Sequence, residues 1–152
     1  MDDNRSNVAD RCTVAVFHEN PPRDDIFAIR RQVFVEGQGV PKTEEFDGGD
    51  EDAIQFLAQV DGRPVGTARL RSPEPGVGKV ERVAVLEAYR GEGLGRAIMA
   101  AVERVAIEDD LERLVLHGQV AVKDFYRSVG YEITSDVYME VGIPHITMEK
   151  EL

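Results

Sequence analysis

The stretch that decides the fold reads Val83-Ala84-Val85-Leu86-Glu87-Ala88-Tyr89-Arg90-Gly91-Glu92-Gly93-Leu94-Gly95-Arg96. It predicts a β-strand, a short turn, a glycine-rich loop and the start of a helix. Glycines at alternate positions leave little side-chain bulk between backbone and ligand, so N–H groups can converge on an anion at the positive end of the helix dipole. Arg90 and Arg96 add positive charge in a chain of net charge −11. The loop therefore predicts an anion site.

The spacing of the loop excludes two common phosphate-binding motifs. A Walker A loop ends in Gly-Lys-Ser/Thr, whereas Gly95 is followed by Arg96 and Ala97. A dinucleotide-binding G-x-G-x-x-G motif needs its third glycine where Arg96 stands. The spacing that fits is R-x-x-G-x-G, formed by Arg90, Gly93 and Gly95. It resembles the pyrophosphate loop of the GNAT superfamily of acyl-CoA N-acyltransferases. The alternative is a turn and helix start that are rich in glycine for structural reasons.

The length and composition bound the class of protein. The 152 residues predict a single domain at 12–152, which we expect to be an N-acetyltransferase (GNAT) domain, preceded by a mobile polar tail at 1–11. No apolar run approaches the ~20 residues needed to cross a bilayer. Cys12 is the only cysteine, which excludes an internal disulfide and favours a reducing cytoplasm. The expected location is therefore cytoplasmic.

The charge pattern is strongly acidic. Asp and Glu number 29 against 18 Lys and Arg, and only four of the basic residues are lysine. Such a surface argues against nucleic acid and against anionic membranes as partners. Abundant carboxylates with few lysines suggest a halophile-like, salt-adapted surface, because dissolved salt screens the self-repulsion.

Salt adaptation predicts that stability rises with ionic strength. Melting curves recorded from low to molar KCl measure this directly. The expected result is a melting temperature that increases along the series, and an unchanged melting temperature would contradict the hypothesis.

The order of predicted elements gives an α/β (α+β) fold. A hairpin at Asp61-Gly62 indicates antiparallel strands, and helical crossovers later in the chain imply a parallel pair. Asp24 or Asp25 is expected to cap the first helix, and Ser72 to Gly78 is expected to be a turn. The expected strands are Thr13–Phe17, Ile54–Val60, Pro64–Arg71, Lys79–Val85, Leu114–His117, Tyr131–Ile133, Tyr138–Val141 and Ile146–Met148, with helices from about 24, from Leu94 and over Val120–Val129.

Further stretches strengthen the resemblance to the GNAT family. Phe125-Tyr126-x-x-x-Gly130-Tyr131 resembles the family's FYxxxGF segment. Gln119 stands where many relatives carry asparagine, and Glu140-x-Gly142-Ile143-Pro144-His145-x-x-Met148 is similar to the ElaA-like branch. The resemblance covers roughly residues 13–152. It implies a mixed, mostly antiparallel sheet of six to seven strands with a splayed central parallel pair and helices on both faces.

The resemblance implies acetyl-CoA, or another acyl-CoA, as co-substrate. Its pantetheine arm would pair with the backbone around the end of the fourth strand, and its pyrophosphate would lie on the loop N–H groups. Glu92 must then point outward, because it would otherwise repel the phosphates. The expected cofactor-binding residues are Val83, Ala84, Val85, Arg90, Gly91, Glu92, Gly93, Leu94, Gly95, Arg96 and Gln119.

Acyl transfer to an amine also needs an acid and a base. Tyr126 is the expected general acid for the leaving thiolate, against the alternative of a core aromatic. Glu81 is the candidate base, on the argument that strand alternation puts it on one face with Val85. The alternative for Glu81 is an ion pair with a neighbouring arginine such as Arg69. His145 and His117 are rival bases, of which His145 is the better candidate. The alternative for His117, on a strand that looks buried, is a core histidine with its hydrogen bonds satisfied.

An acidic loop offers the candidate acceptor site. Glu45, Asp47 and Asp50, with Arg30 and Arg69, resemble a pattern in acyl-homoserine-lactone synthases, although those enzymes generally lack the R-x-x-G-x-G loop. The alternative is a solvated loop held by arginine–carboxylate pairs.

Three functions remain open at this point. The first is an N-acetyltransferase that acts on a small-molecule or peptide amine by direct attack. The second is a synthase-like acyltransferase, and the third is a non-catalytic acyl-CoA sensor. No metal is expected, because the histidines and carboxylates lack metal-ligand spacing, and a homodimer is left open.

Overall fold

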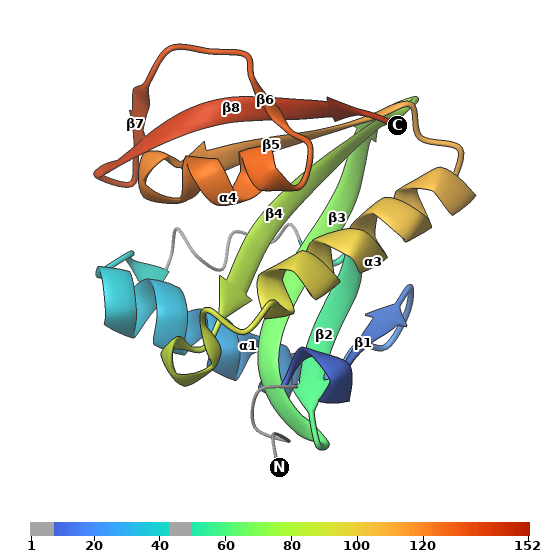
Figure 1. Ribbon diagram of the computed structural model, residues 1–152, viewed down its shortest axis with the longest axis vertical. Helices are drawn as coiled ribbons and strands as arrows, with labels where there is room; N and C mark the ends of the chain where they lie inside the picture. The colour runs from blue at the N-terminus through green and yellow to red at the C-terminus, as the bar shows by residue number, and fades with distance from the viewer. Residues whose placement is uncertain (1–7, 43–49) are drawn as a thin grey trace. The chain divides into compact units, whose positions relative to one another are not determined.

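The computed structural model describes residues 8–42 and 50–152, and an eight-stranded sheet organises them (Figure 1). The strands follow the order β1-β2-β3-β4-β5-β8-β6 across the sheet, and β7 also pairs with β8. β4 and β5 run parallel. The mixed fold with a parallel pair is as predicted, and the eight strands exceed by one the six to seven that the family resemblance implied. The strands are β1 (Cys12–Phe17), β2 (Ile54–Val60), β3 (Arg63–Glu74), β4 (Val77–Val85), β5 (Arg113–Gln119), β6 (Glu132–Ile133), β7 (Tyr138–Glu140) and β8 (Ile143–Glu151).

The helices are α1 (Arg23–Arg30), α3 (Leu94–Glu108) and α4 (Lys123–Ser128), and α1 continues as a π-helical segment at Arg31–Glu36. The prediction that an aspartate caps α1 is wrong. Pro22 is the N-cap residue, no side chain caps the helix, and Asp24 and Asp25 lie in its first turn. There the two carboxylates still interact favourably with the helix dipole.

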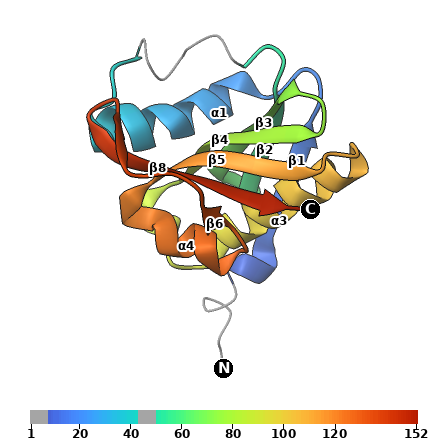
Figure 2. The ribbon, with the colours of Figure 1, turned by 90° about the horizontal axis from the view of Figure 1, so that it is seen from above.

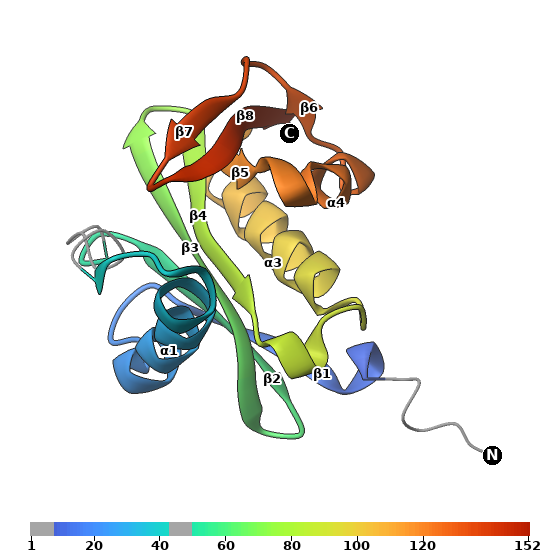
Figure 3. The same cartoon turned by 90° about the vertical axis from the view of Figure 1, so that its left-hand side faces the viewer.

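By its contacts the chain divides into two compact units. The first comprises residues 1–69 and 82–101. In this unit α1 packs its apolar residues against Leu57 and Ala84. α3 lies on the other side of these strands from α1 (Figure 3). A Cβ on Gly66 would lie 2.9 Å from the Ile98 Cδ1 atom of α3 and 3.1 Å from the Ala84 carbonyl oxygen, so a larger residue at Gly66 would press against the backbone of β4.

The β2–β3 hairpin forms where the sequence predicted it. Its two-residue turn consists of Asp61 and Gly62, whose φ angles are 52° and 81°. Two positive φ angles characterise the type I′ turn, whose twist matches that of the flanking strands. The register of this strand pair is therefore set locally.

The second unit comprises residues 70–81 and 102–152, and β8 is its organising strand (Figure 2). β8 pairs with β5 from Gln119↔His145 to Arg113↔Glu151, and it also pairs with β6 and β7. The predicted strand Ile146–Met148 was too short, because backbone pairing extends it into polar sequence at both ends. The predicted turn Ser72 to Gly78 was too long, since β3 continues to Glu74 and β4 begins at Val77.

The predicted tail at 1–11 lies largely outside the described residues. Of its described part, Ala9–Arg11 forms a 3-10 helix, and the Arg11 Nη1 atom lies 2.9 Å from Asp61 Oδ2 in an exposed ion pair. The single domain at 12–152 stays a prediction. Within residues 8–42 and 50–152, no helix is both long and apolar enough to cross a membrane.

Candidate active site

The glycine loop of the first unit leads directly into α3. Gly91 and Gly93 have φ angles of 78° and 85°, a region that residues with a side chain seldom adopt. The Ala97 N–H donates to the Gly93 carbonyl oxygen at 3.1 Å, so Gly93 stands immediately before the first turn. In any α-helix the first N–H groups have no acceptor within the helix. Here those groups belong to residues 94–96, where the predicted anion would bind.

Space and charge around the loop agree with this prediction. A Cβ on Gly91 would meet no atom within 4 Å, and a Cβ on Gly93 would lie 3.5 Å from the Ala9 Cβ. Glu92 is exposed, as required. The Arg90 Nε donates to the Val85 carbonyl oxygen at 2.9 Å, so this arginine also holds the loop against the end of β4.

The parallel strands β4 and β5 pair over four residues only. Their register runs from Val77↔Arg113 to Val80↔Leu116, although both strands continue beyond it. Arg82 then takes a φ angle of 57°, which interrupts the extended backbone of β4. The argument that alternation puts Glu81 and Val85 on one face therefore does not hold, because a left-handed residue lies between them.

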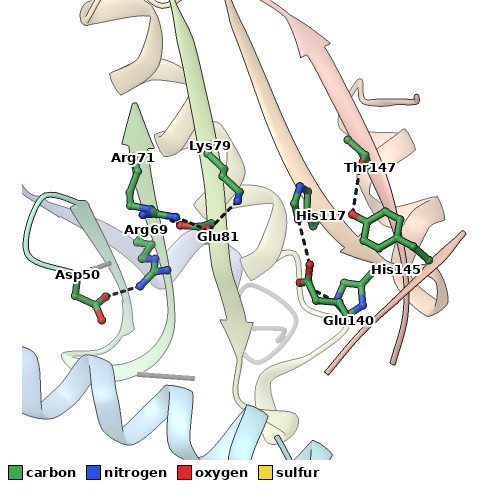
Figure 4. Close-up of polar contacts among 10 residues, drawn as sticks. Asp50, Arg69, Arg71, Lys79, Glu81, His117, Glu140, His145 and Thr147 are labelled. Atoms are coloured by element: carbon green, nitrogen blue, oxygen red, sulfur yellow. Dashed lines mark hydrogen bonds and ion pairs between the residues drawn. The ribbon is translucent and has the colours of Figure 1, made fainter. Parts of the chain in front are cut away.

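Glu81, the predicted base, is held in a network of positive charge (Figure 4). Arg71 donates to it through both Nε and Nη2, at 2.6 and 2.9 Å, and the Lys79 Nζ lies 3.4 Å from its Oε2. The Glu81 side chain is 11% exposed. The alternative to a catalytic base, an ion pair between Glu81 and a neighbouring arginine, is thus present. The partner is Arg71, whereas Arg69 was the example named from the sequence. A carboxylate engaged by two cations is a weak proton acceptor.

Tyr126, the predicted acid, is buried in the second unit. It lies on α4, and its ring packs edge-on against Phe125 and Tyr131, at centroid distances of 5.1 and 6.1 Å. Gly118 of β5 makes room for it, since a Cβ there would lie 3.3 Å from the ring. Burial raises the pKa of Tyr126 to about 12. The hydroxyl therefore keeps its proton throughout the neutral and mildly alkaline range.

A cluster of polar side chains lies on β5, β7 and β8, and we call it the His117 cluster (Figure 4). Its centre is Glu140. The His117 Nδ1 is 3.3 Å from Glu140 Oε1, and the His145 Nε2 is 3.8 Å from Oε2. Tyr138 and Thr147 complete the cluster, with 3.0 Å between their hydroxyl oxygens. Of the two interpretations of His117, the core histidine is wrong, because the side chain is 35% exposed.

His145, the rival base, is the buried histidine. It is 5% exposed and stacks on Tyr138, with 6.3 Å between ring centroids. Its Nδ1 lies 2.7 Å from the Ile143 carbonyl oxygen. A carbonyl only accepts, so Nδ1 carries a proton and cannot act as base. Gln119 stands opposite His145 in the register of β5 and β8.

The predicted acceptor residues are brought together only in part. In the first unit the Asp50 Oδ1 lies 2.6 Å from Arg30 Nη1 and 3.2 Å from Arg69 Nη1, and Gln55 donates to it at 3.0 Å. Both arginines are fully buried. The other two acidic residues, Glu45 and Asp47, lie outside the described residues. For the described part, burial favours the alternative in which arginine–carboxylate pairs hold the loop.

Burial and hydrogen bonding compete at Asp50. Desolvation raises the pKa of its carboxyl, but the hydrogen bond and charge of Arg30, the hydrogen bond of Gln55 and the charge of Arg69 outweigh it. The net pKa is lowered. No group of three or more His, Cys, Asp or Glu residues within 8–42 and 50–152 is arranged to hold a metal ion.

Comparisons with known proteins place these features in a family. A family model described as the acetyltransferase (GNAT) domain matches residues 32–152. YjcF of Bacillus subtilis (strain 168), an uncharacterized N-acetyltransferase, is 35% identical over 128 residues, which cover 84% of this chain and 91% of that protein. ElaA of Escherichia coli (strain K12) is 32% identical over 132 residues, which cover 84% and 86%.

Solved structures agree with the sequence comparison. The crystal structure of Escherichia coli ElaA has a TM-score of 0.81 at 30% identity, and the alignment covers 91% of this chain and 99% of that one. A GNAT family acetyltransferase from Elizabethkingia anophelis, solved with acetyl-CoA bound, shares the fold with a TM-score of 0.72 at 18% identity, over 94% and 99%. The chain therefore belongs to the GNAT family of acetyltransferases, in its ElaA-like branch, and is an acyl-CoA-dependent N-acetyltransferase.

Proposed function

We propose that this enzyme transfers an acetyl group from acetyl-CoA to a primary amine by direct attack of the amine on the thioester. The observation that carries the proposal is the glycine loop before α3, with Gly91 and Gly93 at positive φ angles and open space beside Gly91. This geometry suits the pyrophosphate of CoA. Charge-assisted hydrogen bonds contribute roughly 1.5–3 kcal/mol each, so a few of them suffice for micromolar binding.

The remainder of the donor would lie along β4. Beyond Val80↔Leu116 the strands β4 and β5 are not paired with each other, so their backbone groups there can pair with an extended ligand. The amides of a pantetheine arm offer such groups. We assign this role to the backbone of residues 83–85.

The chemistry requires a proton for the departing sulfur. The amine nitrogen attacks the carbonyl carbon, and the carbon–sulfur bond breaks. CoA then departs as a thiolate, and its departure is easier when the sulfur gains a proton. We assign Tyr126 as the donor of this proton. With its pKa raised to about 12 by burial, the hydroxyl carries its proton at neutral pH, which a proton donor requires.

Substitution of the tyrosine tests the assignment. Tyr126→Phe removes only the hydroxyl, and we expect kcat to fall by about 100-fold, in the range of general acid catalysis, with acetyl-CoA affinity unchanged. The measurement is release of the CoA thiol from acetyl-CoA with spermidine, L-lysine, kanamycin and a peptide with a free N-terminus, run in high salt.

Tyr131→Phe is the matched control, because Tyr131 is equally buried in the same aromatic group. It should leave kcat within a few-fold. An unchanged kcat in Tyr126→Phe would remove Tyr126 from the mechanism. If acetyl-CoA binds but no amine in the panel stimulates thiol release, the sensor alternative gains.

A further inference from the structure

The His117 cluster occupies one face of three neighbouring strands. Paired residues of a sheet point to the same face. The registers pair His117 with Thr147, and His145 with Tyr138. Glu140, two residues from Tyr138 on β7, shares that face and completes the cluster. Three strands thus present two imidazoles and a carboxylate together.

His117 is the accessible imidazole of the cluster. Its Nδ1 faces the Glu140 carboxylate, and its ring packs edge-on against Tyr138, at 5.8 Å between centroids and an interplanar angle of 84°. Within the described part of the chain, its other nitrogen, Nε2, has no hydrogen-bond partner. A carboxylate on one nitrogen fixes the tautomer with Nδ1–H, which leaves a lone pair on Nε2.

The position of His117 suits a catalytic role. Pairing of β4 and β5 ends at Val80↔Leu116, so Glu81 and His117 are the first residues beyond the paired segment. Parallel register puts both on one face, together with Lys79. The next residue of β5, Gly118, faces the Tyr126 ring instead. β5 therefore separates the proposed acid on one face from His117 on the other.

Direct attack needs this separation. The nucleophile approaches the thioester carbonyl from one side, while the leaving sulfur needs its proton elsewhere. Glu81 lies on the same face as His117, but Arg71 and Lys79 already engage its carboxylate. His117 has an open nitrogen, and its other nitrogen faces the Glu140 carboxylate at 3.3 Å.

We propose that His117 is the general base of acetyl transfer and that Glu140 is its positioning residue. This inference rests on the proposed function. The His117 Nε2 takes a proton from the acceptor ammonium, the free amine forms the carbon–nitrogen bond, and the carbon–sulfur bond breaks. The nitrogen gives up two protons in total; one is matched by the proton that the CoA sulfur gains, and the other leaves to solvent.

Charged and titratable groups surround the imidazole on each strand packed against it. β7 contributes Glu140 and Tyr138, β8 contributes His145, and β4 contributes Glu81 and Lys79 at the neighbouring positions. Glu140 is the group that faces the His117 Nδ1, so its substitution should change which ring nitrogen carries the proton.

Three substitutions test the proposal. The rate measured is that of thiol release from acetyl-CoA with the four acceptors named above. His117→Gln should lower the rate at neutral pH by about 100-fold and remove the acidic limb of the pH profile. Glu140→Gln should lower the rate by about 10-fold, because the imidazole loses the carboxylate that orients it. Acetyl-CoA affinity, measured by calorimetry, should stay within two-fold. His18→Gln removes an exposed histidine of the first unit, and it should change neither the rate nor the pH profile.

A second measurement does not depend on turnover. In nitrogen NMR spectra of the neutral imidazole, His117 should be the Nδ1–H tautomer in the wild type, and Glu140→Gln should weaken this preference because an amide can also donate to Nδ1. An unchanged tautomer in Glu140→Gln, or a His117→Gln enzyme with an unaltered rate and profile, overturns the inference. If Glu81→Gln alone removes the limb, Glu81 is the base. Failure of the wild-type protein to bind acetyl-CoA would instead overturn the proposed function.

Discussion

Gly93→Glu is expected to abolish acetyl-CoA binding while the protein stays folded. The substitution places a carboxylate at the N-terminus of α3, where the pyrophosphate would otherwise accept N–H hydrogen bonds. Loss of two such bonds, at roughly 1.5–3 kcal/mol each, weakens binding by about 1,000-fold before any repulsion is added. Isothermal titration calorimetry with acetyl-CoA measures the loss.

Backbone strain must be separated from charge in this experiment. Gly93 has a φ angle of 85°, where any side chain costs roughly 1–2 kcal/mol. Gly93→Ala carries the same strain, and its Cβ would make only an ordinary contact at 3.5 Å with Ala9, so we expect near-normal affinity. Gly62→Glu, at a φ angle of 81° and with nothing within 4 Å, carries both strain and charge at the β2–β3 turn, outside the glycine loop. Retained affinity in a cooperatively melting Gly93→Glu would overturn the loop assignment.

Asp50→Asn is expected to destabilise the fold by about 3 kcal/mol or more. The Asp50 carboxylate is the shared partner of two fully buried guanidinium groups, those of Arg30 and Arg69. Removing one partner from a buried ion pair costs about 3–5 kcal/mol, because charge is left buried without compensation. Urea unfolding should show a lower midpoint with an unchanged slope.

An exposed aspartate provides the comparison. Asp61 pairs with Arg11 at 2.9 Å, but both side chains are largely exposed. Asp61→Asn should therefore change the free energy of unfolding by less than about 1 kcal/mol, and asparagine suits its turn. Equal effects of the two substitutions would show that the Asp50 cluster contributes no more than a surface pair.

The contribution of Asp50 should also depend on pH, and its sign follows from the lowered pKa. A carboxyl with a lowered pKa in the folded state stabilises that state above its unfolded pKa, about 3.9. The difference between wild type and Asp50→Asn should be constant above about pH 5. It should shrink as the pH falls below about 4, through the folded pKa of Asp50.

Local sequence determines much of this fold. The hairpin at Asp61-Gly62 and the loop from Arg90 to Arg96 depend on residues adjacent in sequence, and both were predictable. Only the centre of β8, Ile146–Met148, was predictable. Pro144 and the charged residues 149–151 give no strand signal, and the length of β8 is set by its pairing with β5, β6 and β7. The π-helical segment Arg31–Glu36 was not predicted, because the spacing of its apolar residues fits an α-helix equally well.

The candidate site divides in the same way. The loop proposed to bind CoA was suggested by spacing alone, and Tyr126, the proposed acid, by its motif. The partnership of Glu140 with His117 depends on the β7–β8 hairpin, whose turn is Val141-Gly142. Valine at a φ angle of 46° is rare, so the turn gave no sequence signal. The Glu-x-Gly-Ile-Pro-His stretch contained the residues, but their contact with β5 is tertiary.

The two buried arginines bear on the composition of the chain. A guanidinium keeps its proton even where water is excluded, whereas a buried lysine readily becomes neutral. With arginine at positions 30 and 69, the positive charge beside Asp50 is retained in the interior. A lysine at either position could lose its proton there and leave Asp50 without a cationic partner. The chain has fourteen arginines and four lysines. At these two positions the preference follows from the chemistry of the interior, independently of the salt in which the protein works.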